Sequence, residues 1–255
     1  MESSPFRWTS ASRSHPGRVR EVNEDAFLEL PGRGIWAVAD GMGGHSLGEF
    51  ASRLAIRSLA DLPPSPGLEH SIAQAQDRLQ GANRRLRDEA ARHDIQLIGT
   101  TIAALLVARR ECACLWAGDS RIYRYRNGRI RALTRDHSEI EAARSRGARK
   151  AGDTLHLPPA NVITRALGAE DRVEIDCVRT GVLDGDIFLL CSDGLSNEVT
   201  EAAIEQALLP GNCRHAAQQL LDLALGHGGR DNITAVVVRA EDPCSPDRTV
   251  MHPVL

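Results

Sequence analysis

Five aspartates stand at the ends of apolar, strand-like runs of the sequence. Asp40, Asp119 and Asp193 each follow such a run within two residues, whereas Asp25 and Asp231 each stand two residues before one. In an antiparallel sheet, the ends of strands that run one way lie at the same edge as the starts of strands that run the other way. We therefore expect the five carboxylates to converge at one edge of the fold.

Carboxylates gathered in this way need a counter-charge, because like charges a few ångströms apart repel each other and raise each other's pKa. Oxygen ligands without histidine or cysteine favour hard cations such as Mg²⁺ or Mn²⁺ over Zn²⁺. Gly41 and Gly194 follow Asp40 and Asp193, and glycine allows a tight turn in which a backbone carbonyl can also reach a metal. One Asp-Gly pair indicates only a turn, but the joint pattern predicts a metal site.

Seven short segments resemble the ordered motifs of the protein phosphatase 2C-like, or PPM, family, and they resemble its bacterial branch most closely. Each motif is short, but seven of them in the family order are very specific, and they span roughly residues 8 to 240. The segments are Val19 to Asp25, Asp40 to His45, Gly99 to Thr101, Ala117 to Arg121, Asn161 to Gly168, Cys191 to Leu195 and Gly229 to Asn232.

The resemblance implies a binuclear metal centre with two tight sites for Mn²⁺ or Mg²⁺. Asp40 would bridge both ions, and Asp193 and Asp231 would complete the first site. The carbonyl of Gly41 would serve the second ion, and Asp119 with Asp193 matches a weaker third site.

Other matched positions imply supporting roles. Glu24 and Asp25 would help to hold the metals directly or through water, and Arg20 matches the arginine that grips the substrate phosphate. Some family members carry a proton-donating histidine directly after the second motif's Asp-Gly, where this chain has Met42. His45 is the nearest histidine and the candidate general acid, although a metal-bound water is the alternative that we favour.

The activity implied by the resemblance is hydrolysis of phosphoserine and phosphothreonine by direct attack of a metal-bridging water. Two metal ions neutralise the phosphate dianion and lower the pKa of that water, so no nucleophilic Cys or Ser and no phosphoenzyme is needed. The implied partners are phosphorylated proteins, namely a Ser/Thr kinase and its substrates.

The elements that must position these residues alternate between hairpin strands and helices. Strands grouped into hairpins, with helices grouped separately, indicate an α+β fold, and the resemblance implies a four-layer α-β-β-α sandwich with two central, mainly antiparallel sheets. Apolar spacing predicts helices over residues 47–59, 68–90, 200–209 and 214–225. Strands are predicted over residues 27–30, 35–39, 101–108, 112–117, 122–125, 130–133, 173–178, 187–191 and 233–239.

One phosphatase domain is expected over residues 1–240, followed by a flexible tail over residues 241–255. Residues 139–160 are polar and close with Pro158-Pro159, which indicates an exposed helical excursion, a candidate lid or docking flap. That segment departs from the family pattern over residues 147–159, so it does not identify the substrate.

Composition excludes several other classes of protein. The formal net charge of -3 over 255 residues argues against a nucleic-acid partner and against a metal nuclease, which would need a basic groove. No run approaches the roughly 20 apolar residues of a membrane span, and Met1 to Arg7 has no apolar signal core. We therefore expect a cytoplasmic protein with no membrane partner, and a monomer.

Two alternatives share the same resemblance. A pseudophosphatase that only binds a phosphorylated partner should lack metal aspartates, whereas Asp40, Asp193 and Asp231 are all present. A phosphatase that serves an anti-sigma-factor antagonist would have the same chemistry with a different partner, and the sequence leaves that choice open.

Overall fold

Strand β3 (Ile35–Met42) shows why the chain folds into layers. Successive side chains of a strand point to opposite faces of its sheet, and both faces of β3 are apolar. Ile35 and Ala37 pack toward the helices on one side, whereas Trp36 and Val38 pack toward a second sheet on the other. A sheet that is buried on both faces needs a covering layer on each side.

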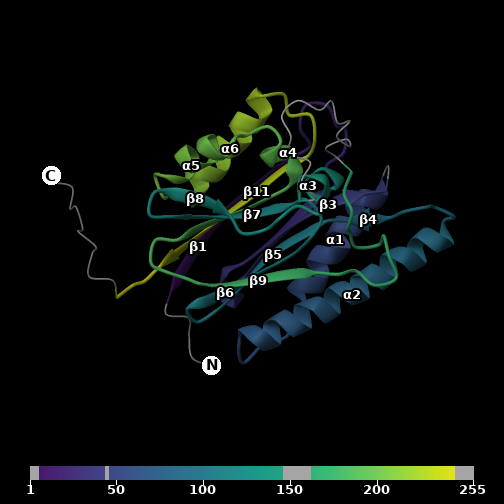
Figure 1. The fold of residues 1–255 in the computed structure, drawn as a ribbon, viewed down its shortest axis with the longest axis horizontal. Helices are drawn as coiled ribbons and strands as arrows, with labels where there is room; N and C mark the ends of the chain where they lie inside the picture. The colour runs from purple at the N-terminus through teal and green to yellow at the C-terminus, as the bar shows by residue number, and fades with distance from the viewer. Residues whose placement is uncertain (1–5, 44–45, 146–161, 245–255) are drawn as a thin grey trace.

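The computed structural model describes residues 6–43, 46–145 and 162–244, and it contains two sheets packed face to face between helices (Figure 1). Every strand pair described within these sheets is antiparallel. The first sheet has the order β2 (Asp25–Leu30), β3, β5 (Ile102–Ala108), β6 (Glu111–Ala117) and β9 (Asp176–Gly181), with β4 (Gly99–Thr100) paired to β3. The second has the order β1 (Arg7–His15), β11 (Ile233–Glu241), β10 (Ile187–Cys191), β7 (Arg121–Arg126) and β8 (Arg129–Ala132).

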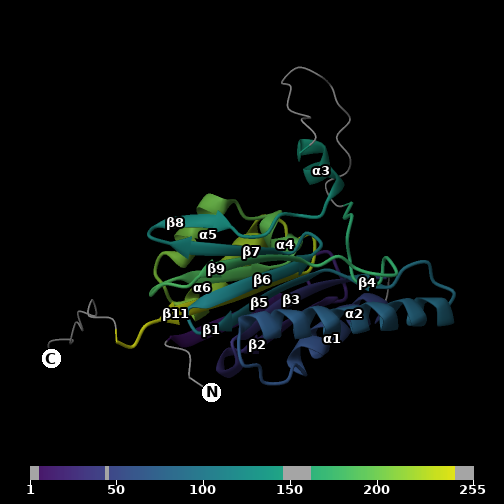
Figure 2. The same cartoon turned by 60° about the horizontal axis from the view of Figure 1, so that its bottom comes forward.

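Helices cover the outer face of each sheet, as Figures 1 and 2 show. The first sheet is covered by α1 (Ser46–Ala60) and α2 (Leu68–Arg92). The second is covered by α5 (Glu201–Leu208) and α6 (Cys213–Gly226), with the short α4 (Asp193–Ser196) beside them. Three apolar cores result, one between the sheets and one under each helical layer. The predicted α+β four-layer sandwich is therefore confirmed.

Strand β1 was absent from the sequence prediction. Its residues are mostly Ser, Thr and Arg, with Trp8 and Ala11 as the apolar members. Trp8 packs between the sheets, with its ring centroid 5.3 Å from that of Trp36, and Ala11 packs on the opposite face under the helices. Two apolar residues among nine give too weak an alternation to indicate a strand.

Strand β9 begins three residues later than predicted, at Asp176 rather than Val173. Val173 and Ile175 are apolar because they pack into the core beside α2 before the strand begins. The apolar pattern of this segment therefore reports burial against a helix, not pairing in the sheet.

The predicted excursion over residues 139–160 begins with α3 (Glu139–Ser145), which projects from one end of the sandwich (Figure 2). The rest of that segment and residues 245–255 of the predicted tail lie outside the described residues. Within the described ranges, every helix is too short or too polar to span a membrane.

Candidate metal centre

The acidic residues of both sheets meet at one end of the sandwich. Asp25 opens β2 and lies directly opposite Asp40 in the β2–β3 register. Asp119 follows β6 on the same sheet, whereas Asp193 begins α4 directly after β10, and Asp231 precedes β11 on the other sheet. We call these five residues the acidic edge.

Burial and mutual repulsion disfavour the charged forms of four of these carboxylates, those of Asp25, Asp40, Asp119 and Asp193. Burial raises the pKa of Asp25 to about 7, with further contributions from Asp193 and Asp231. Burial likewise raises the pKa of Asp119 to about 7, and Asp193 adds to it. The pKa of Asp40 is raised by burial and then by the charges of the other four aspartates, so Asp40 interacts with every other member of the acidic edge. Such a cluster needs a cation to be stable in its charged form.

Two buried carboxylate oxygens lack a hydrogen-bond partner among the described residues. Asp25 Oδ2 accepts a 2.8 Å hydrogen bond from Ser192 Oγ, but Asp25 Oδ1 and Glu24 Oε1 accept none. Buried polar atoms are normally satisfied, so these free lone pairs fit a missing positively charged partner. The donor set consists of oxygens alone, which suits Mg²⁺ or Mn²⁺.

No three acidic, histidine or cysteine side chains within residues 6–43, 46–145 and 162–244 form a ready-made cage around one ion. Mg²⁺ keeps several water ligands and is usually bound by one or two protein carboxylates.

The backbone of Asp40 is held from both sides by two buried threonines. Thr101 Oγ1 accepts from the Asp40 amide at 3.0 Å, and the Thr101 amide and Thr100 Oγ1 both donate to the Asp40 carbonyl at 2.9 Å. Thr101 Oγ1 also lies 2.7 Å from Ser120 Oγ, directly after Asp119. This network fixes Asp40 relative to Asp119.

Glycines allow the backbones of the site to approach closely. A Cβ atom on Gly41 would collide with the carbonyl oxygen of Gly48, and one on Gly48 would collide with the carboxylate of Glu24. A Cβ on Gly194 would collide with the carbonyl of Asn232. Only glycine fits at these three positions, so the turn after Asp40 and the start of α1 pack directly beside Glu24.

Asn232 holds the loop before β2 against β11, a role that the sequence analysis did not assign. Its side-chain amide donates to the carbonyls of Pro16 at 3.0 Å and Val22 at 2.9 Å, and its Oδ1 accepts from the amide of Glu24 at 2.7 Å. This buried side chain therefore positions the loop that carries Arg20 and Glu24. Its place beside Asp231 in the seventh motif was the available signal.

Arg20 reaches the acidic edge from that loop. Its guanidinium donates to Asp231 Oδ2 at 2.9 Å, and its side chain is 56% exposed. The ion pair with Asp231 raises the pKa of Arg20 further above its ordinary value. An exposed arginine tethered at one nitrogen keeps other N–H donors for a phosphate.

His137 supports the loop of Asp119. Its Nδ1 accepts from the amide of Gly118 at 3.2 Å, and its Nε2 lies 3.2 Å from Asp176 Oδ2. The ring stacks on Trp116 with an interplanar angle of 14°, and burial lowers the pKa of His137. A neutral His137 thus acts as a structural support for the loop of Asp119.

His45, the candidate general acid, lies outside the described residues. Met42 ends β3 and is partly buried, so a thioether occupies the position of the family's proton donor. The choice between His45 and a water as proton donor stays a prediction.

Comparison with known proteins identifies a matching family and similar phosphatases. The sequence model of the family described as protein phosphatase 2C matches residues 13–221. A serine/threonine phosphatase, stp, of Listeria innocua is 34% identical over 235 residues, which cover 89% of this chain and 93% of that protein.

Solved structures of similar proteins share the fold. PppA, described as a key regulatory component of T6SS in Pseudomonas aeruginosa, is 41% identical with a TM-score of 0.85 and coverage of 91% of this chain and 97% of that chain. The catalytic domain of the serine/threonine phosphatase PstP in complex with two manganese ions is 34% identical with a TM-score of 0.82, and the match covers 93% of this chain and 100% of that one.

Proposed function

The chain belongs to the protein phosphatase 2C family, and on that premise we propose that it is a metal-dependent phosphatase of phosphoserine and phosphothreonine in proteins. The single observation that carries the proposal is the acidic edge. Five carboxylates gather there, and among the described residues the buried oxygens Asp25 Oδ1 and Glu24 Oε1 have no hydrogen-bond partner. Bound cations would stabilise the charged forms of such a cluster.

Residues of the acidic edge would hold two ions in separate roles. Asp40 interacts electrostatically with the other four aspartates and is the candidate ligand shared by both ions. Asp193 and Asp231 would complete the first site. The Gly41 carbonyl, Glu24 and Asp25 would serve the second ion, and Asp119 with Asp193 would form the weaker third site. When bound, the cations supply charge neutralisation for the phosphate dianion and an activated water. The manganese complex of PstP supports this assignment of the metal.

The chain's own residues orient the phosphate and fix the ligands. Arg20, tethered to Asp231 at 2.9 Å, directs its remaining N–H groups to phosphate oxygens in a fork. Ser192 holds Asp25 from the opposite sheet at 2.8 Å, and Thr101 holds Asp40 through its amide at 3.0 Å. The ligands are therefore positioned before substrate arrives, so little reorganisation is needed during reaction.

The substrates are phosphoproteins that a Ser/Thr kinase produces, and the kinase itself is one of them. The 34% identity to the serine/threonine phosphatase stp of Listeria innocua supports phosphoserine and phosphothreonine in proteins as the substrate class. The rival role of a catalytically silent binder is disfavoured because Asp40, Asp193 and Asp231 are all retained at the acidic edge.

The test is phosphate release from a phosphothreonine peptide and from an aryl phosphate by the purified chain. We expect turnover with Mn²⁺ or Mg²⁺ and none after chelation. Binding of the phosphopeptide without turnover at any metal concentration would show the silent binder instead.

A further inference from the structure

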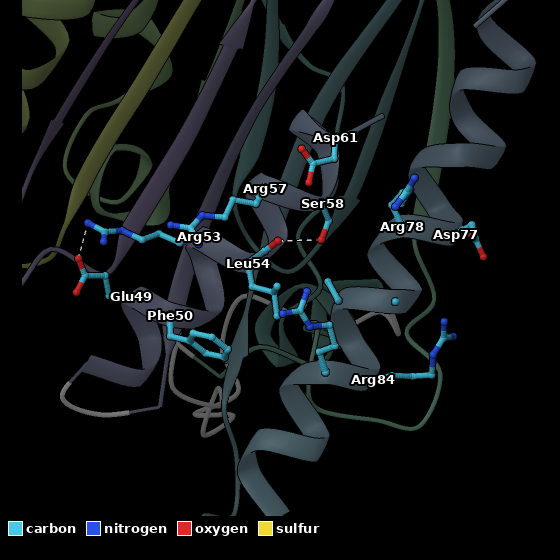
Figure 3. Close-up of a pocket in the computed structure, with 13 residues that line it drawn as sticks. Glu49, Phe50, Arg53, Leu54, Arg57, Ser58, Asp61, Asp77, Arg78 and Arg84 are labelled. Carbon is cyan, nitrogen blue, oxygen red and sulfur yellow. Dashed lines mark hydrogen bonds and ion pairs between the residues drawn. The ribbon is translucent and has the colours of Figure 1, made fainter. Parts of the chain in front are cut away.

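A hollow lies between α1 and α2, on the outer helical layer. It has a volume of about 620 Å³ and is lined by both helices. Its lining includes Leu54 and Ala82, which are both buried. Figure 3 shows Phe50 pointing from α1 toward α2, whereas Arg53 and Arg57 extend from α1 on the side of Glu49, away from α2.

The hollow carries a surplus of positive charge. Five arginines line it against three acidic residues, Glu49, Asp61 and Asp77. Among the described residues, only Arg53 of these five has an ion-pair partner, Glu49 one turn away. The other four, Arg57, Arg78, Arg84 and Arg85, are exposed and paired with no described carboxylate. We call this hollow the arginine groove.

The arginine groove continues toward the acidic edge. A neighbouring hollow of about 710 Å³ shares Glu49, Arg53 and Arg57 with it and reaches Asn23 and Asp25. Two exposed apolar side chains also line this second hollow, Val22, which is 46% exposed, and Phe27, which is 39% exposed. A polypeptide in the second hollow would thus lie between the catalytic edge and the arginines.

The spacing along α1 suits an extended chain. Gly48 packs against Glu24 at the acidic edge, and Arg53 and Arg57 lie five and nine residues further along the helix. At about 1.5 Å per helical residue these are roughly 7 and 13 Å away. An extended peptide covers about 3.3 Å per residue, so the arginines lie about two to four residues from the phosphorylated residue.

We propose that the arginine groove binds an acidic segment of the phosphoprotein substrate, placed about two to four residues from the phosphorylated side chain. The proposal rests on the proposed phosphatase function and adds the substrate class. The guanidinium groups pair with Asp and Glu carboxylates of the substrate, while Val22 and Phe27 contact apolar side chains between the two sites. The groove offsets the repulsion that an acidic substrate meets at the carboxylates of the catalytic end.

The experiment compares phosphothreonine peptides that carry three Asp or Glu residues, about two to four positions before or after the phosphothreonine, with Asn/Gln versions of the same peptides. Wild type is expected to prefer one acidic series by about three- to tenfold in kcat/KM, the effect of two or three exposed ion pairs. The variant Arg57→Gln/Arg85→Gln should lose that preference.

The control variant is Arg129→Gln/Arg131→Gln, which removes the same charge from exposed positions on β8 and should keep the preference. An aryl phosphate measured alongside tests the phosphatase function separately, because it has no acidic segment. If aryl phosphate turns over but acidic and neutral peptides are equal substrates, the groove proposal is overturned and the phosphatase function stands.

Fluorescence anisotropy of a labelled acidic peptide without phosphate measures binding to the arginine groove independently of turnover. Binding that is weakened by Arg57→Gln/Arg85→Gln and not by the control variant supports the proposal even if no turnover is seen. No binding, or equal weakening by both variants, contradicts it.

Discussion

The acidic edge and the arginine groove carry opposite charge and are built in opposite ways. At the acidic edge, Asp25 is buried and Asp40 is fixed through both its amide and its carbonyl. In the groove, Arg57 and Arg85 are exposed and no described carboxylate holds them. A buried charged group is costly unless its partner is present, whereas an exposed pair contributes little. Single changes at the edge should therefore act sharply, and changes in the groove gradually.

The largest effect is expected for Asp193→Asn at the acidic edge. This substitution keeps the size of the side chain but removes a charge that interacts with Asp231 and Asp40. Metal ions supply several kcal/mol of charge stabilisation, so turnover with Mn²⁺ should fall on the order of 10³-fold or more. The control Asp88→Asn, at an exposed position of α2, should retain wild-type turnover. Full activity of Asp193→Asn would remove Asp193 from the metal centre.

The second effect concerns the stability of the metal-free protein as a function of pH. Burial raises the pKa of Asp25 and of Asp119 to about 7 from 3.8. A carboxyl with a raised folded-state pKa stabilises the fold while it is protonated, so its contribution is complete below about pH 4 and is lost as pH rises through 7. The free energy of unfolding should therefore fall by a few kcal/mol between pH 5 and 8.

Urea denaturation after chelation measures this pH dependence, and adding Mn²⁺ at pH 8 should restore stability. Asp119→Asn should show a shallower pH dependence, because an amide does not titrate. Identical slopes in wild type and Asp119→Asn would show that Asp119 is solvated and does not belong to the buried acidic edge.

A third prediction separates stability from catalysis with two buried asparagines. Asn232 bonds three backbone groups of the loop that carries Arg20 and Glu24. Asn83 bonds three backbone groups of the Gly168 turn beside α2. Substitution of either by Ala should lower the free energy of unfolding by about 2–3 kcal/mol, since each leaves buried groups without partners.

Activity measured below the unfolding transition should distinguish these two variants. Asn232→Ala should also raise KM for phosphopeptides, because the loop of Arg20 is released, whereas Asn83→Ala should keep KM unchanged. Equal KM in both variants would show that the hydrogen bonds of Asn232 stabilise the fold without positioning Arg20.

These asparagines also show what the sequence could and could not predict. The aspartates were predictable because each stands beside a strongly apolar run, and strand order then brings them to one edge. The sandwich was predictable because buried strands such as β3 are apolar on both faces. By contrast, Asn232 acts through hydrogen bonds to residues about 210 positions away, and no local pattern reports such a contact.

Weak local sequence patterns explain the other differences between the sequence prediction and the structure. Strand β1 has two apolar residues among nine, so its pairing with β11 depends on tertiary packing and not on its own alternation. The arginine groove could not be predicted from the sequence, because its residues come from two helices and their packing is known only from the structure. An arginine-rich composition alone indicated nothing about where the side chains gather.

Arg20 combines a feature of the arginine groove with one of the acidic edge, since its side chain is exposed but forms an ion pair with Asp231. Arg20→Ala should raise KM for phosphopeptides about tenfold and change kcat less, because a grip on the ground-state phosphate is largely uniform binding. Arg20→Lys should recover little of this loss, because an ammonium lacks the planar fork. Steady-state kinetics on one phosphothreonine peptide measures both constants. An unchanged KM in Arg20→Ala would assign phosphate binding to another group.

The smallest effect is expected from salt, and it bears directly on the contrast between buried and exposed charge. Interactions between exposed charges are screened beyond about 10 Å at 0.1 M salt and beyond about 3 Å at 1 M. The arginine groove is exposed, so the three- to tenfold preference for an acidic peptide should shrink toward unity as NaCl rises from about 0.05 to 0.5 M. Turnover of an aryl phosphate reports the buried edge, where screening is weak, and should change much less. Because Arg57→Gln/Arg85→Gln lacks the preference, its ratio of acidic to neutral peptide turnover should stay flat across the same titration. A wild-type preference that persists at 0.5 M NaCl would place the acidic segment in a desolvated site and not in the groove.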